Sequence, residues 1–239
     1  ADDGVEVAGD RAGSAGLRSA GKARGGATRL RGKPAELSYH TASLPDGYTC
    51  MSDASAFSYD EAFSRNIGWV TQAEQAALRG KRVAIAGMGG VGGVHLLTLV
   101  RLGIGAFNIA DMDTFDVVNF NRQAGAAMSS VGRPKAEVMA EMARDINPEL
   151  QLCRFDQGVQ ATNVDAFLEG VDLYVDALDF FAFDARQLIF AACARKGIPA
   201  LTVGPLGMGA ALVNFMPGRM SFEACFGFDR ADPIDKALR

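Results

Sequence analysis

Three glycines and one aspartate have the types and the spacing needed to bind a nucleotide. Gly87, Gly89 and Gly92 fit G-x-G-x-x-G between two apolar stretches, and Asp111 ends the next apolar run. Glycine lets the backbone turn sharply and approach a phosphate, whose charge is favoured by N–H groups at the start of a helix. Asp111 follows at close to the spacing of about 20 residues expected of a ribose-binding carboxylate. We predict a nucleotide site; the alternative is that the glycines only allow tight packing between helix and strand.

The elements that must position these residues alternate along the chain. Apolar runs predict strands at 83–86, 106–110, 150–155, 173–178, 199–203 and 210–215, with a glycine-rich turn at 204–209. Helical patterns lie at 94–102, 135–146, 164–168 and 184–196. The alternation predicts an α/β fold, a Rossmann-like doubly wound and mostly parallel sheet with helices on both faces. Ligands of such sheets bind at the carboxyl ends of the strands, where Asp111 and Asp179 lie.

A helical segment is expected before the first strand. Residues 59–78 have apolar side chains at near-helical spacing, interrupted at Gly68. Thr71 and Glu74 form the capping-box pattern S/T-x-x-E, which predicts that a second helix starts there.

Composition narrows the functional classes. The 239 residues are 49% hydrophobic and 22% charged, with a net charge of −4, which does not favour a nucleic-acid or acidic-membrane partner. No apolar run approaches the roughly 18 residues of a membrane span. The four cysteines form no C-x-x-C and only two histidines are present, so we expect no zinc site. Reduced thiols favour a cytoplasmic location, and Cys153, Cys193 and His95 are expected to be structural.

The N-terminal residues differ from the rest. Residues 11–33 carry seven basic side chains and no acidic one among many Gly, Ala and Ser, which predicts disorder. A basic nucleic-acid arm, a transit peptide, and an upstream extension before a true start at Met51 are the alternatives. The predicted organisation is a disordered extension at 1–50, a helical segment at 51–80 and a nucleotide-binding domain at 81–239.

The segment after Asp111 is too long for a plain turn and too polar for a core, so we expect it to be functional. With its neighbours it completes a series of motifs: RNIG at 65–68, GMGGVGG at 87–93, DMD at 111–113, NFNRQ at 119–123, VGRPK at 131–135, INP at 146–148 and DALD at 176–179. Their order and spacing resemble the ThiF/MoeB/HesA family, bacterial relatives of ubiquitin-activating enzymes. The resemblance covers roughly residues 59–215.

This resemblance implies ATP-dependent adenylation of a carboxylate, with Mg²⁺ and ATP as cofactors. Asp111 would hold the ribose, Asn119, Arg122 and Lys135 the phosphates, and Asp179 the Mg²⁺. Arg65 would reach the ATP of a neighbouring subunit, which implies a homodimer. The expected nucleotide-binding residues are Gly87, Gly89, Gly90, Gly92, Asp111, Asp113, Asn119 and Gln123, and the expected catalytic residues are Arg65, Arg122, Lys135 and Asp179. The substrate would be a small acid or the C-terminus of a peptide or a ubiquitin-like sulfur carrier.

Some residues depart from the family pattern. Phe180 stands where relatives often have an Asn, and the paired C-x-x-C motifs are absent. Cys225 is expected to be a plain thiol rather than an acyl-accepting nucleophile. Relatives usually continue beyond residues 216–239 with a substrate-binding segment, so we expect either a fragment or a reduced substrate site. A non-catalytic nucleotide-binding module and an NAD-dependent oxidoreductase remain the alternative functions.

Overall fold

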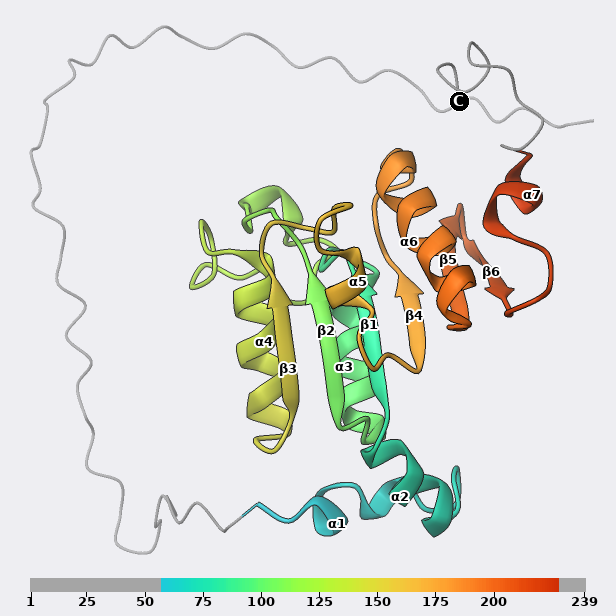
Figure 1. Ribbon diagram of the computed structural model, residues 1–239. Helices are drawn as coiled ribbons and strands as arrows, with labels where there is room; N and C mark the ends of the chain where they lie inside the picture. The colour runs from blue at the N-terminus through green and yellow to red at the C-terminus, as the bar shows by residue number, and fades with distance from the viewer. Residues whose placement is uncertain (1–56, 228–239) are drawn as a thin grey trace, which may run out of the picture. The chain divides into compact units, whose positions relative to one another are not determined.

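The sheet has six strands in the order β3-β2-β1-β4-β5-β6 (Figure 1). The computed structural model describes residues 57–227, all within the unit Asp53–Arg239. Strand bounds are β1 Arg82–Ala86, β2 Ala106–Ala110, β3 Gln151–Phe155, β4 Leu173–Asp176, β5 Ala200–Leu206 and β6 Gly209–Phe215. The first five are parallel and β6 runs antiparallel to β5. The predicted mostly parallel sheet is confirmed.

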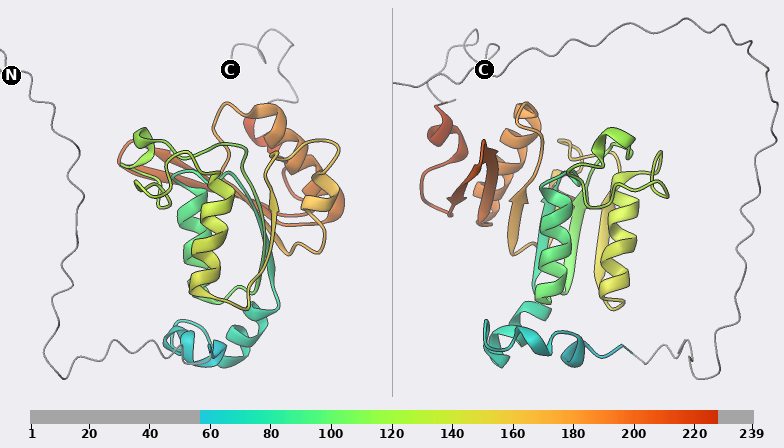
Figure 2. Two further views of the ribbon diagram at one scale, coloured as in Figure 1. Left: turned by 90° about the vertical axis from the view of Figure 1, so that its left-hand side faces the viewer. Right: turned by 180° about the vertical axis from the view of Figure 1, so that it is seen from behind.

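Helices cover both faces of the sheet (Figure 2). They are α3 Gly92–Leu102 and α4 Lys135–Ile146 on one face, and α5 Val164–Phe167 and α6 Phe183–Lys196 on the other. Ile85 of β1 packs with Leu96 and Met139 in one buried cluster, while its neighbours Ala84 and Ala86 belong to the cluster of Ile189. Alternate residues of one strand therefore serve two cores, which explains why the central strands are continuously apolar.

The N-terminal helices are α1 Tyr59–Ala62 and α2 Gln72–Arg79, with a short 3-10 turn at Ser64–Asn66. The capping box at Thr71 and Glu74 is present, as predicted. Asn66 Nδ2 donates to the carbonyl of Leu102 at 3.1 Å. These helices therefore pack against the C-terminal end of α3.

Two predicted segments differ in their limits. Strand β4 ends at Asp176 rather than Leu178, because the Asp176 carboxylate accepts from the amide of Leu178 at 3.4 Å. The predicted turn at 204–209 is too long: β5 continues to Leu206, which pairs with Gly209, and the turn is confined to residues 207–208, where Gly207 has a φ of +59°. β4 pairs with β5 only up to Thr202, so later residues of β5 face no strand on that side.

The cysteine prediction is half correct. Cys193 is buried in α6, but Cys153 is exposed, because β3 is an edge strand and most of its side chains face solvent. Up to residue 227, one helix follows the last strand, α7 Phe222–Phe226. Among the described helices, none combines the length and apolar composition that crossing a membrane requires. The predictions for residues 1–50 lie outside the described residues, and the predicted domain boundary at 80–81 stays a prediction.

Candidate nucleotide site

The glycine loop joins β1 to α3 at the carboxyl edge of the sheet. Gly87 has a φ of +93°, and a Cβ there would lie 2.2 Å from the carbonyl oxygen of Ala177. A Cβ at Gly92 would lie 1.7 Å from the carbonyl oxygen of Gly87. These two positions require glycine for the fold itself, so the packing alternative accounts for them fully.

Gly89 is different, because packing does not explain it. A Cβ there would meet nothing closer than Gln123 Nε2 at 3.8 Å, which is ordinary contact. Among the described residues, no side chain caps the N-terminus of α3. The absence of a side chain at Gly89 therefore leaves the backbone accessible at a helix start, which is where phosphates bind.

Asp111 fixes the loop to the end of β2. Its Oδ2 accepts a hydrogen bond from the amide of Met88 at 2.6 Å, and its Oδ1 accepts from the amide of Asp113 at 2.8 Å. A carboxylate has about four lone-pair positions, so it can accept further hydrogen bonds from a ribose. Asp111 thus joins the glycine loop to the segment that carries Asp113.

Lys135 is a buried cation at the start of α4. Its Nζ lies 3.1 Å from Asp113 Oδ2, and its side chain is 9% exposed against 66% for Asp113. The amide of Lys135 also donates to the carbonyl of Asp113 at 2.9 Å. An ammonium has three N–H donors, and one carboxylate does not satisfy all of them. Lys135 is therefore held in one place with donors available for phosphate.

Of the remaining predicted residues of the long loop, Arg122 and Gln123 contact the glycine loop, whereas Asn119 shapes the long loop itself. Asn119 is buried, and its Oδ1 accepts from the amide of Asp116 at 2.9 Å, which builds the 3-10 turn at Val117–Asn119. Arg122 is exposed, and its carbonyl oxygen would lie 3.2 Å from a Cβ at Gly90. Gln123 is buried beside Gly89, and its Oε1 has no hydrogen-bond partner among residues 57–227.

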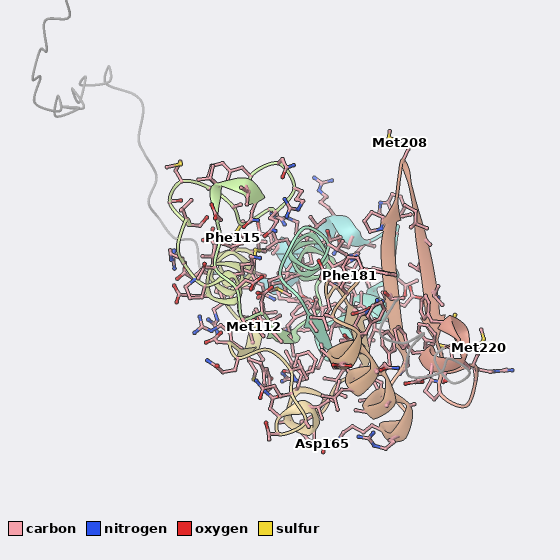
Figure 3. All side chains as sticks on the ribbon, turned by 90° about the horizontal axis from the view of Figure 1, so that it is seen from above. Met112, Phe115, Asp165, Phe181, Met208 and Met220 are labelled. Atoms are coloured by element: carbon pink, nitrogen blue, oxygen red, sulfur yellow. The ribbon has the colours of Figure 1, made fainter. Side chains whose placement is uncertain are left out.

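Asp179 lies in the loop between β4 and α6. It is exposed, and its Oδ1 accepts from the amide of Phe181 at 3.0 Å. Phe180 and Phe181 beside it are 60% and 75% exposed. Figure 3 looks down on this edge and shows Phe181 between the loop that carries Phe115 and the hairpin tip that carries Met208. The site is bordered by apolar side chains.

Arg65 is the one predicted residue that lies away from this group. Its neighbour Asn66 contacts the carbonyls of Arg101 and Leu102 at the C-terminal end of α3, whereas the glycine loop precedes the other end. An 11-residue helix is about 16 Å long. Arg65 therefore does not reach the nucleotide site of its own chain.

Sequence reasoning missed a buried ion pair beside the site. Asp176 and Arg186 are 2% and 6% exposed, and Arg186 Nη2 lies 2.8 Å from Asp176 Oδ2. One signal was available, because Arg186 precedes buried Ile189 and Phe190 by three and four positions on α6 and so shares their face. A charged residue in an apolar helical stripe requires a partner.

Comparison with known proteins places these features in one family. A model described as the ThiF family matches residues 63–237. The tRNA threonylcarbamoyladenosine dehydratase of Escherichia coli is 40% identical over 126 residues, covering 52% of this chain and 46% of that protein. The sulfur carrier protein ThiS adenylyltransferase of Escherichia coli is 30% identical over 143 residues, covering 60% and 56%.

A solved structure of the Escherichia coli dehydratase TcdA in complex with ATP has a TM-score of 0.58 and 34% identity. The match covers 63% of this chain and 61% of that one. This chain therefore spans about half of the curated relatives it matches and somewhat more of the solved one. The family model covers most of the chain, and the chain belongs to the ThiF family.

Proposed function

We propose that this protein uses ATP to adenylate a carboxylate, giving an acyl-adenylate and pyrophosphate. The observation that carries the proposal is the buried cation Lys135, which pairs with Asp113 in the segment that Asp111 joins to the glycine loop, together with Arg122, whose backbone packs against Gly90 of that loop. The ATP held by the similar dehydratase structure and the adenylyltransferase activity of the ThiS-specific relative support it.

The chemistry explains the charges. A carboxylate oxygen of the substrate attacks the α-phosphorus of ATP, a new P–O bond forms, and the bond to the β-phosphate breaks to release pyrophosphate. Two anions meet and a third departs, so the protein mainly has to orient the reactants and stabilise charge. Arg122 can bind phosphate with two parallel hydrogen bonds, and Lys135 supplies a compact charge. Asp111 would hold the ribose.

The residues present fit a magnesium ion. Mg²⁺ is usually bound through one or two carboxylates together with waters and substrate phosphates. Asp179 is an exposed carboxylate with one described hydrogen bond, so it can act as such a ligand. Within residues 57–227, no three His, Cys, Asp or Glu side chains are grouped to hold a metal. Bound Mg²⁺ would neutralise phosphate charge.

We further propose a homodimer in which Arg65 acts on the ATP of the other subunit. The position of Arg65 at the far end of α3 supports this, because it cannot contact its own site. The acyl substrate would be a small acid or the C-terminus of a peptide or ubiquitin-like carrier, and the location cytoplasmic. The dehydratase relatives act on a tRNA nucleoside, which makes a nucleic acid the competing substrate.

Calorimetry tests the nucleotide part first. We expect the purified chain to bind Mg-ATP and not NAD, and Asp179→Asn to weaken the binding of Mg-ATP. Asp165→Asn is the matched control, because Asp165 is an exposed acid on α5 (Figure 3). Binding of NAD without ATP would instead establish the oxidoreductase alternative.

Pyrophosphate exchange tests the reaction. We expect ATP to incorporate labelled pyrophosphate when a suitable carboxylate is added, and ATP binding without exchange for every carboxylate would favour a non-catalytic module. Phe180 in place of the usual Asn is the observation that favours this second candidate.

A further inference from the structure

A buried network surrounds the last residue of β4. Asp176 Oδ2 accepts from Arg186 Nε at 2.9 Å and from Thr202 Oγ1 at 2.8 Å, and Arg186 Nη2 also lies within 2.8 Å. Asp176 Oδ1 accepts from Tyr174 Oη at 3.3 Å. Burial raises the pKa of Tyr174 well above its ordinary value, so the phenol stays protonated and donates. The network joins β4, β5 and α6.

Arg186 extends this network to the loop that carries Asp179. Its Nη1 points to the carbonyl oxygen of Phe180 at 3.4 Å, a long hydrogen bond. Its guanidinium carbon lies 5.9 Å from the ring centre of Phe180 and 5.1 Å from that of Phe222. One planar group therefore contacts β4, β5, the β4–α6 loop and α7 at once.

The loop is short and fixed at both ends. The amide of Ala177 donates to the carbonyl of Ala86 at 2.9 Å, and the amide of Leu178 donates to Asp176. Asp179 then accepts from the two amides that follow Phe180. The carbonyl of Phe180 lies within this turn, so the contact from Arg186 fixes the segment directly after Asp179.

The same loop supports the glycine loop. A Cβ at Gly87 would lie 2.2 Å from the carbonyl oxygen of Ala177, and a Cβ at Gly92 would lie 2.9 Å from the Cβ of Ala177. A shift of the β4–α6 loop would therefore move the backbone that faces the nucleotide as well as the Asp179 carboxylate.

A buried ion pair is a poor source of stability, because desolvation offsets much of its attraction. Its presence here needs another explanation, and the planar fork of arginine provides one, since it fixes several partners in one geometry. We propose that Arg186 is a positioning residue, which holds the β4–α6 loop so that Asp179 faces the nucleotide. The role of Asp179 in this statement rests on the proposed function, whereas the holding of the loop does not.

Amide hydrogen exchange of the protein without nucleotide tests the holding. Arg186→Lys keeps the charge beside Asp176 but cannot reach Asp176 and the carbonyl of Phe180 with one planar group. We expect the amides of Phe181 and Ala182 to exchange at least about five times faster in this variant. Thr202→Val is the matched control, because it removes both hydrogen bonds of Thr202 Oγ1, to Asp176 and from Arg186 Nη2, and leaves the contact from Arg186 Nη1 to Phe180. Its loop should exchange within about twofold of the wild type.

Equal exchange in the wild type and Arg186→Lys, or equal acceleration by both variants, would overturn the proposal, since the network would then be purely structural. If Arg186→Lys does not fold, the pair Asp176→Asn with Arg186→Met removes both charges together, which proteins often tolerate. For that double variant we again expect faster exchange of the amides of Phe181 and Ala182, and exchange equal to that of the wild type would overturn the proposal.

Calorimetry with ATP then tests whether the effect of Arg186 on nucleotide binding acts through Asp179. The ratio of ATP affinity with Mg²⁺ to that with EDTA should fall in Asp179→Asn and in Arg186→Lys, and the double variant should lose no more than Asp179→Asn alone. Additive losses would show that Arg186 does not act through Asp179. If the wild-type protein binds ATP equally well with Mg²⁺ and with EDTA, the magnesium part of the proposed function fails. Hydrogen exchange then still decides whether Arg186 holds the loop.

Discussion

The two ends of α3 are both tightly packed, but their polar groups are used differently. At the C-terminal end, Asn66 and Gln75 donate to the carbonyl of Leu102, and Tyr59 donates to that of Gly103. At the N-terminal end, no described side chain caps the helix, although Asp111 accepts from the amide of Met88 in the loop before it. The carbonyls at one end are satisfied within the chain, whereas the amides at the other end remain available to a ligand.

The same comparison separates glycines that packing requires from Gly89, which packing does not require. Gly103 follows α3 with a φ of +96°, and a Cβ there would lie 2.1 Å from Gln75 Nε2. Gly89 lies before α3 with space for a Cβ. The sequence pattern alone cannot distinguish Gly103 from Gly89. The atoms that would surround a Cβ at each position do distinguish them.

The largest effect should come from Lys135, the buried cation of the proposed nucleotide site at the start of α4. Lys135→Ala should reduce pyrophosphate exchange by about 100- to 1,000-fold, because a preorganised charge near the reacting phosphates is lost. The melting temperature should change little, because Asp113 is exposed and water can solvate its carboxylate once the lysine is removed. Lys196→Ala, which removes a lysine paired with Asp165, is the control. Exchange that persists in Lys135→Ala would contradict the proposed role.

The glycine comparison gives the next effect. Gly103→Ala should lower the free energy of unfolding by about 1–3 kcal/mol, because alanine is strained in a left-handed conformation and its Cβ meets Gln75. Gly89→Ala should leave thermal unfolding unchanged and weaken ATP binding by about tenfold, roughly 1.4 kcal/mol. Thermal unfolding measures the stability of each variant, and calorimetry measures its affinity for ATP. Equal destabilisation by the two substitutions would remove the distinction between the ends.

A smaller loss is expected at the capped end. Asn66→Ala removes the donor to the carbonyls of Arg101 and Leu102 and should cost about 1 kcal/mol of unfolding free energy. Affinity for ATP should stay the same at protein concentrations below those at which the proposed dimer would form, because this end faces away from the proposed nucleotide site. Chemical denaturation gives the stability, and a change in ATP affinity at concentrations without dimer would contradict the separation of the two ends.

Most elements of this fold could be predicted because their signals are local. The helix at 135–146 was placed to the residue, since a proline precedes it and Asn147-Pro148 follows it. Asp111 and Asp179 were placed at the correct sheet edge because Asp111 directly follows β2 and Asp179 comes three positions after the end of β4. The proposed roles of the site residues stay predictions.

Features that depend on distant partners could not be predicted. The pairing of Asp176 with Arg186 requires that β4 and α6 meet, and Thr202 joins them from a third element. Cys153 was expected to be buried because it lies in a strand, but only the strand order shows that β3 is an edge. Local patterns identify elements, whereas neighbours decide burial and charge pairing.

The smallest effect should come from the body of α3, between its two ends. Burial lowers the pKa of His95 below its ordinary value of 6.5, and its Nε2 has no hydrogen-bond partner among the described residues. The unfolded chain therefore takes up a proton more readily than the folded one. The stabilisation linked to neutral His95 is present above pH 6.5 and is lost as the pH falls towards the lowered value.

Replacing this histidine by a neutral side chain should remove that dependence. In His95→Gln, the melting temperature should fall less between pH 7.5 and pH 5.5 than in the wild type, by about 1–2 °C. Thr98→Ala, at an exposed position of the same helix, is the control and should leave the pH dependence unchanged. An identical pH dependence in His95→Gln and the wild type would show that His95 accepts a proton as easily in the folded state as in the unfolded chain. Its position on α3 would then be open to solvent, and the comparison of the two ends would have to include a third accessible region.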